Sequence, residues 1–132
     1  MNLKERLLKW TVLASLYLFW PGLFFVTWGE LTPHPPAWTE FFWDKSLHFT
    51  AYFGLAAMAT LVLGNGRKLL WALVALAIFG GLLELLQGFT GRDPDIHDEI
   101  ANGIGLVAGY VVASAFAFAL GRRSLVAKGG AG

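Results

Sequence analysis

The sequence predicts an all-α membrane protein, built as a bundle of four transmembrane helices. Hydrophobic residues make up 56% of the 132 residues and charged residues only 14%, whereas a soluble domain carries about 25% charged residues. The apolar residues collect in four stretches that are continuous rather than alternating. Because every backbone polar group must be bonded internally in a bilayer, such stretches predict helices and not strands. We expect one domain over residues 1–132.

The first helix is expected over about residues 7–29. Three basic residues precede its apolar run, as they do in a secretory signal. However, the run is longer than a signal-peptide core, and no small-x-small cleavage site follows it. We therefore expect a retained signal anchor. Pro21-Gly22 lies in the middle of the run and predicts a kink, which membrane helices tolerate when neighbours satisfy the freed carbonyl.

The other helices follow a proline-rich loop that spans residues 30–43. Pro33, Pro35 and Pro36 predict a stiff, extended cover along the membrane surface, and His34 beside them is expected to be a solvated histidine. A helix rising ~1.5 Å per residue crosses ~30 Å of hydrocarbon in roughly 20 residues. The remaining helices are expected over about residues 44–64, 68–90 and 98–121.

Basic and acidic residues are distributed unequally between the two sides of this bundle. Eight of the ten basic residues lie at the termini or between the second and third helices, and eight of the nine acidic residues lie on the other side. The positive-inside bias therefore predicts that both termini are cytoplasmic. Trp28, Trp38 and Trp43 fit an interfacial aromatic belt on the outer side.

A carboxylate closes the third apolar stretch. Glu84 follows the run at 69–83, and because a charge there is expensive in lipid, a functional role is the default interpretation. Residues three and four apart share a helix face. Glu84 and Gln87 therefore lie on the same face as Gly80, which points them toward neighbouring helices and away from lipid.

Two further polar groups lead into neighbouring helices. In the fourth helix, Asp98 and Asn102 share a face with Gly105-x-x-x-Gly109, a pattern that marks close helix approach. The loop before this helix is short, so the third and fourth helices are expected to be antiparallel neighbours. As an alternative, Asp98 is only a helix N-cap.

The second helix contributes the third group. Asp44 and His48 lie on one face of it, and Tyr52 follows one turn below His48. All three groups are expected to meet in an outward-facing polar pocket with Glu84 at its floor. The expected ligand-binding residues are Asp44, Lys45, His48, Tyr52, Glu84, Gln87, Arg92, Asp95, Asp98 and Asn102.

These residue types leave several functions open. A binding or modulating protein would hold a polar envelope molecule, with Lys45 and Arg92 on its phosphate. An interfacial hydrolase or transferase would use Glu84, His48 or Asp98 as acid or base. A structural network or assembly subunit would pair Glu84 with Lys45 or Arg92. A proton pathway is disfavoured, because the other half of the bundle offers few polar groups.

No cofactor is assigned from the sequence, although a divalent metal ion is a candidate. Carboxylate and imidazole groups could hold zinc, manganese or magnesium. His97 is expected to be a loop residue outside such a site, and the chain lacks cysteine, which rules out thiol chemistry. The candidate metal ligands are His48, Glu84, Asp95 and Asp98.

Three motifs together resemble the VanZ-like family of small bacterial membrane proteins. The resemblance spans about residues 43–109, and the motifs stand in the family order. They are Asp44-Lys45-x-x-His48-Phe49-x-x-Tyr52, Glu84-x-x-Gln87, and Arg92-x-x-Asp95-x-x-Asp98-x-x-x-Asn102-x-x-Gly105.

This resemblance implies a multi-pass protein of the bacterial plasma membrane that acts on the cell envelope. The founding member of the family is associated with low-level resistance to teicoplanin, so a link to glycopeptide tolerance is an expectation; the resemblance implies no particular reaction. The expected partners are membrane lipids and a lipid-linked envelope precursor, teichoic acid or phospholipid headgroup. No nucleic-acid partner is expected.

Overall fold

Four long helices make up the regular structure of the described chain. The computed structural model describes residues 1–33, 37, 44–91 and 94–122. Each helix is long and apolar enough to cross a membrane, which confirms the predicted all-helical membrane class. The helices are α1 (Leu3–Leu31), α2 (Asp44–Leu63), α3 (Arg67–Gln87) and α4 (Ile96–Ala119).

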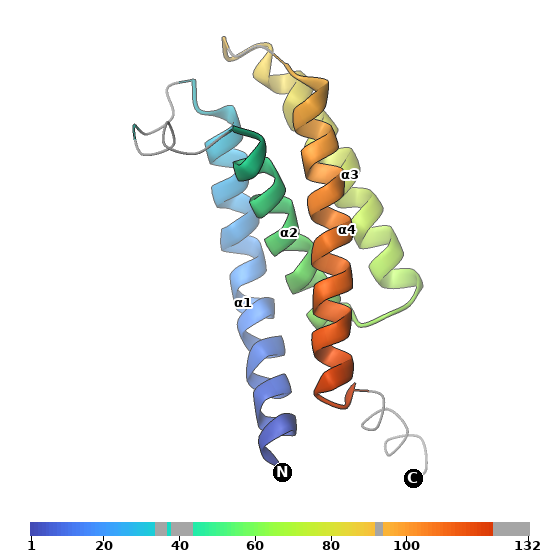
Figure 1. Cartoon of the computed structure of the whole chain (residues 1–132). Helices are drawn as coiled ribbons and strands as arrows, with labels where there is room; N and C mark the ends of the chain where they lie inside the picture. Colours follow the sequence, from blue (N-terminus) through green and yellow to red (C-terminus); the bar gives the residue numbers. More distant parts are fainter. Residues whose placement is uncertain (34–36, 38–43, 92–93, 123–132) are drawn as a thin grey trace.

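The helices run alternately up and down, so each end of the bundle collects particular segments (Figure 1). The end of α1, the start of α2, the end of α3 and the start of α4 lie together, and we call this the polar end. The start of α1, the turn at 64–66 and the end of α4 lie at the opposite end.

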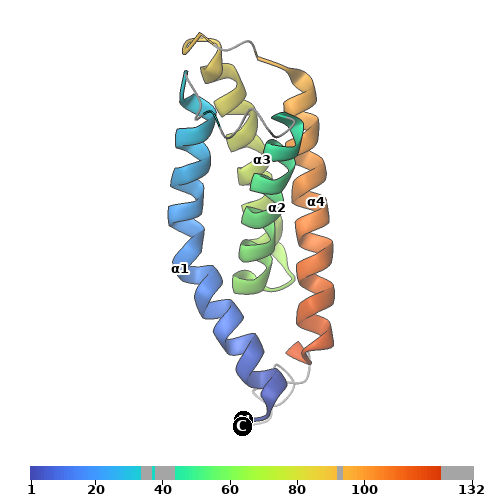
Figure 2. The same cartoon turned by 60° about the vertical axis from the view of Figure 1, so that its left-hand side comes forward.

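The first helix is longer than predicted at both ends. Asn2 and Glu5 form a capping box, in which each side chain accepts a hydrogen bond from the other residue's backbone N–H, and this starts the helix at Leu3. The helix continues through Pro21 and bends near its middle (Figure 2), as a missing backbone donor leads one to expect. Its last turn includes Glu30, which the sequence analysis wrongly placed in the loop.

The fourth helix begins earlier than predicted. Asp95 is its N-cap, and its side chain accepts a hydrogen bond from the backbone N–H of His97 at 2.9 Å. The predicted loop position of His97 was therefore wrong, because His97 belongs to the first turn of α4. The alternative that Asp98 is only the cap is also excluded, because Asp98 is the third helical residue. Because Asp95 supplies the cap, the Asp98 side chain is available for contacts across helices.

Glycines let α4 lie directly against α2. A Cβ atom added at Gly105 would overlap the carbonyl oxygen of Phe49, and one at Gly109 would overlap that of Phe53. The small-residue stripe on α4 therefore marks the contact with α2, while α3 runs antiparallel to α4 behind it (Figure 1). This close approach fixes the register between the polar residues of α2 and those of α4.

The packed interior is small and most large apolar side chains lie outside it. Tyr52, Leu55 and Leu106 are among the buried residues of the main cluster, which Leu76 joins from α3. By contrast, aromatic residues such as Phe24 and several leucines on α1 and α3 are exposed. Extensive exposed apolar surface over the helix length is expected of a protein whose outer solvent is lipid.

Candidate functional site

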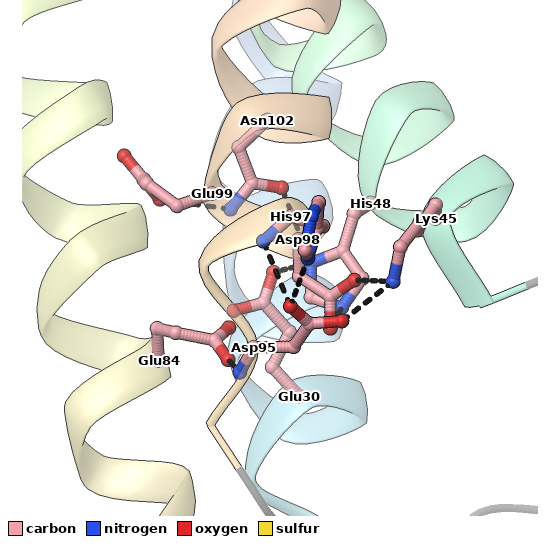
Figure 3. A network of polar contacts seen from close by, with 9 residues as sticks. All are labelled: Glu30, Lys45, His48, Glu84, Asp95, His97, Asp98, Glu99 and Asn102. Carbon is pink, nitrogen blue, oxygen red and sulfur yellow. Dashed lines mark hydrogen bonds and ion pairs between the residues drawn. The ribbon is translucent and has the colours of Figure 1, made fainter.

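Polar side chains from all four helices gather at the polar end (Figure 3). Buried groups come from the last turn of α1, the first turns of α2 and α4, and the last turns of α3. Such groups are costly in an apolar setting unless they are paired or serve a ligand. The buried polar residues at this end are Glu30, His48, Glu84, Gln87, Asp98 and Asn102.

Lys45 joins the start of α2 to the start of α4. Its Nζ donates to Asp95 Oδ2 at 2.7 Å and to Asp98 Oδ1 at 3.1 Å. The Lys45 hydrogen bond is the main reason that the pKa of the Asp95 carboxyl lies well below its usual range, and donors from His97 lower it further. Among the described residues, Lys45 thus pairs with the aspartates of α4, whereas the helix-gluing hypothesis paired it with Glu84.

His48 occupies the centre of the cluster. Its Nδ1 lies 3.2 Å from Asn102 Oδ1 and 3.7 Å from Glu30 Oε1. Its Nε2 lies 3.8 Å from Asp98 Oδ2, which is beyond hydrogen-bond range. The imidazole is buried between α1 and the predicted residues of α4. The sequence analysis did not connect α1 to the site.

Glu84 and Gln87 point into the bundle from α3, as their spacing predicted. Glu84 Oε1 accepts a hydrogen bond from the backbone N–H of Asp95, so it ties the end of α3 to the cap of α4. Gln87 is 1% exposed, and its Nε2 has no hydrogen-bond partner among the described residues. The same holds for the Tyr52 hydroxyl, in a residue that is 0% exposed.

Comparison with models of protein families gives one match for this chain. The family model described as VanZ/LLP1 matches residues 2–118. The chain belongs to the VanZ/LLP1 family. This confirms the family predicted from the motifs, and together with the four apolar helices it identifies a multi-pass membrane protein of the VanZ type. No curated protein and no solved structure matches the chain.

Most motif residues of this VanZ/LLP1 protein lie near one another at the polar end. Nine of the ten predicted ligand-binding residues are described, and they lie on α2, α3 and the start of α4 near the polar end. Asp44 is exposed, while His48 and Asp98 are buried. Arg92 lies outside the described residues.

Sequence reasoning missed two carboxylates of the VanZ/LLP1 cluster. Glu30 is buried beside His48, and Glu99 Oε2 accepts a hydrogen bond from Asn102 Nδ2 at 3.1 Å. A signal for Glu30 existed: it continues the inward stripe of Phe19, Leu23 and Val26 at spacings of four, three and four residues. The predicted end of α1 at residue 29 hid this continuation.

One subset of the cluster has the composition of a metal site. Asp44, His48 and Asp98 each offer a ligand atom, and these three atoms lie within 4.8 Å of one another. Two of the four metal candidates from the sequence, His48 and Asp98, belong to this group. The other two, Glu84 and Asp95, instead contact each other between the end of α3 and the cap of α4.

Proposed function

We propose that this VanZ/LLP1 protein binds the polar headgroup of a cell-envelope molecule at its polar end. In this proposal the protein lies in the bacterial plasma membrane with both termini in the cytoplasm, so the polar end faces outward. The ligand class is a phosphate-bearing headgroup that also carries hydroxyl groups. Lipid-linked precursors, teichoic acids and phospholipids all share this chemistry.

The observation that carries the proposal is a pair of buried polar atoms. The Gln87 amide nitrogen has no hydrogen-bond partner among the described residues, and the Tyr52 hydroxyl, which interacts with the Glu30 carboxylate, makes no hydrogen bond of normal geometry there. Leaving such an atom unpaired costs about 1–3 kcal/mol, which a network that only held helices together would avoid. An amide N–H donates and a hydroxyl both donates and accepts, which suits them to hydroxyl or carbonyl groups of a ligand.

The cationic group of the cluster supports the phosphate part of the proposal. An ammonium group has three donors, and Asp95 and Asp98 accept two hydrogen bonds from Lys45. A phosphate oxygen would take the third, at the edge of the cluster where the Lys45 side chain is partly exposed. The buried amide of Gln87 and hydroxyl of Tyr52 would then form hydrogen bonds with the groups next to the phosphate.

Tyr52→Phe tests this function because it removes only the buried hydroxyl. We expect the free energy of unfolding to stay within about 0.5 kcal/mol or to rise, since an unsatisfied buried group is lost. Binding should fall at least tenfold. The assay is the full chain in nanodiscs, titrated with undecaprenyl phosphate, phosphatidylglycerol and glycerol 3-phosphate to separate the possible sources of the phosphate.

Tyr110→Phe is the matched control, since Tyr110 is an exposed tyrosine of α4. It should alter neither quantity. If Tyr52→Phe lowers the free energy of unfolding by more than about 1 kcal/mol, and no probe binds the parent chain, the polar network only holds helices together.

An interfacial hydrolase or transferase is the second candidate. It is favoured by His48, whose Nδ1 is held by Asn102 while Nε2 faces a carboxylate, an arrangement that suits a general base. Glu84 or Asp98 would supply the acid. Hydrolysis of undecaprenyl phosphate or glycerol 3-phosphate to the alcohol and inorganic phosphate, lost in His48→Gln and retained in Tyr110→Phe, would favour this candidate over binding alone.

A further inference from the structure

The hydrogen bonds of Asn102 fix the protonation of His48. Asn102 Nδ2 lies 3.1 Å from Glu99 Oε2, and Asn102 Oδ1 faces His48 Nδ1 at 3.2 Å. The reverse orientation of the amide would place its oxygen against the Glu99 carboxylate, where two acceptors repel. Because an oxygen therefore faces Nδ1, that nitrogen carries the proton and donates it.

The other imidazole nitrogen then meets a group of the same kind. In the Nδ1–H tautomer, Nε2 is an acceptor with a lone pair, and it faces Asp98 Oδ2 at 3.8 Å. Both side chains are more than nine-tenths buried, with 4% exposed for His48 and 3% for Asp98. Two buried acceptors that face each other without a hydrogen bond form a place where a cation would be stabilised.

Two observations favour a cation between His48 and Asp98: the two Asp98 oxygens have different partners, and a third candidate ligand lies nearby. Asp98 Oδ1 accepts from Lys45, which leaves Oδ2 for a different partner. An Asp44 oxygen lies within 4.8 Å of the ligand atoms of both His48 and Asp98. Ligands held at about 2.1 Å from an ion are at most about 4.2 Å apart, so the exposed Asp44 side chain has to move inward only slightly.

We propose that His48 Nε2, Asp98 Oδ2 and an Asp44 carboxylate oxygen bind a divalent transition-metal cation, Zn²⁺ or Mn²⁺, with water completing its coordination. One imidazole and two carboxylates match the ligands these ions prefer. Asn102 and Glu99 act as the positioning residues, because a metal-binding histidine usually donates its other ring N–H to an oxygen. The site goes beyond headgroup binding and does not require it.

The test is a titration of the full chain in detergent micelles, after chelator treatment, with ZnCl₂ and MnCl₂. We expect one ion per chain and a shift of the Nε2 resonance of His48 in protein with ¹⁵N-labelled histidine, without a shift for His97. Asp44→Asn should weaken binding at least tenfold. This variant changes one exposed side chain, at the first position of α2, and keeps its size and shape.

His97→Gln is the matched control, since it removes an exposed imidazole at the same end that lies outside the proposed ligand set. Its affinity for the ion should stay within about twofold, a change too small to matter next to a tenfold loss (about 1.4 kcal/mol). Absence of ion binding, or equal binding by the parent and Asp44→Asn, overturns the proposal. Headgroup titration in the presence of chelator keeps this result separate from the proposed function.

Discussion

The two ends of the bundle use charged side chains in different ways. At the polar end, Lys45, His48 and Asp98 contact one another or their neighbours across helices, and most of them are buried. At the opposite end, Arg122 donates to the backbone carbonyl oxygens of Thr60 at 3.3 Å and Leu61 at 2.8 Å. There, a charge completes the hydrogen bonds of a helix terminus.

The difference extends to packing. The opposite end has an open cavity of about 520 Å³ between α2 and α4, partly lined by Arg122, whereas polar side chains from all four helices converge at the polar end. Capping the last carbonyls of a helix with a cation explains Arg122 without a ligand. No comparable backbone role explains His48 or Gln87, and this difference supports the function proposed for the polar end.

The largest expected effect concerns which end faces outward. The chain has no cysteine, so a single introduced cysteine reports accessibility directly. Phe89→Cys, at a residue 89% exposed beside the end of α3, should react with a membrane-impermeant maleimide in intact cells. Asn65→Cys in the turn of the opposite end should react only after permeabilisation, because the positive-inside bias places that turn in the cytoplasm.

Reaction of Asn65→Cys alone in intact cells would reverse the orientation and place the acidic cluster in the cytoplasm. The contacts within the cluster would stand, but an extracellular headgroup could no longer be its ligand. Reaction of both cysteines before permeabilisation would indicate leaky cells, which a cytoplasmic marker protein controls.

The close contact between α2 and α4 runs from one end of the bundle toward the other, and Gly109→Ala should disrupt it. The new Cβ would overlap the backbone carbonyl of Phe53, which a side-chain rotation cannot relieve. Overpacking costs about 1–3 kcal/mol and more where backbone must shift, so we expect a loss near 3 kcal/mol in the free energy of unfolding. Reversible unfolding in mixed micelles measures it.

Gly103→Ala is the control on the same helix, because its Cβ would have no atom within 4 Å. Its free energy of unfolding should be unchanged or slightly higher. Equal losses in both variants would mean that helix propensity, and not contact with α2, determines the effect.

Arg122→Ala should affect only the opposite end. Hydrogen bonds to charged groups contribute about 1.5–3 kcal/mol, and we expect about 1 kcal/mol here, since water can reach a half-open site. Hydrogen exchange should accelerate in the last turn of α2, with headgroup and ion binding unchanged. Lys68→Ala, at an exposed basic residue of the same end, should change neither; loss of ion binding in Arg122→Ala would contradict the division between the ends.

Much of the polar end follows from sequence spacing alone. Helical periodicity places Glu84 and Gln87 on one inward face and Asp98 and Asn102 on another, and all four are buried. The family motifs contain the same residues, because positions three and four apart on a helix share a neighbour. These predictions needed only the fact that each segment is a helix.

What failed depended on where helices end and which helices touch. The first helix was expected to end at residue 29, so Glu30 was assigned to a loop, although it occupies the last turn and lies beside His48. Asp95 and Asp98 both suit an N-cap, and only the backbone geometry decides between them. The helix that packs against Gly105 and Gly109 could not be predicted either. A stripe of small residues indicates a close helix contact, but not which helix makes it.

The smallest expected effect is the pH dependence that Asp95 gives the polar end. Hydrogen bonds from Lys45, and then from His97, hold the pKa of Asp95 below its ordinary value in the folded chain, so the unfolded chain takes up the proton first as pH falls. The stabilisation is therefore fully present above about pH 4, the ordinary value, and declines as pH falls toward the lowered pKa. Asparagine also caps helices well, so Asp95→Asn removes the charge and keeps the cap.

We expect the parent chain to exceed Asp95→Asn in free energy of unfolding by a small, constant amount between pH 5 and 7, and by less at pH 3. Added salt should reduce the difference, because the pair is partly exposed. A Lys45→Met background removes the main partner and should abolish most of the pH dependence. The opposite result is a difference in free energy of unfolding between the parent chain and Asp95→Asn that grows below pH 4. It would mean that acidic neighbours destabilise the charged form of Asp95 and that the pairing with Lys45 does not dominate.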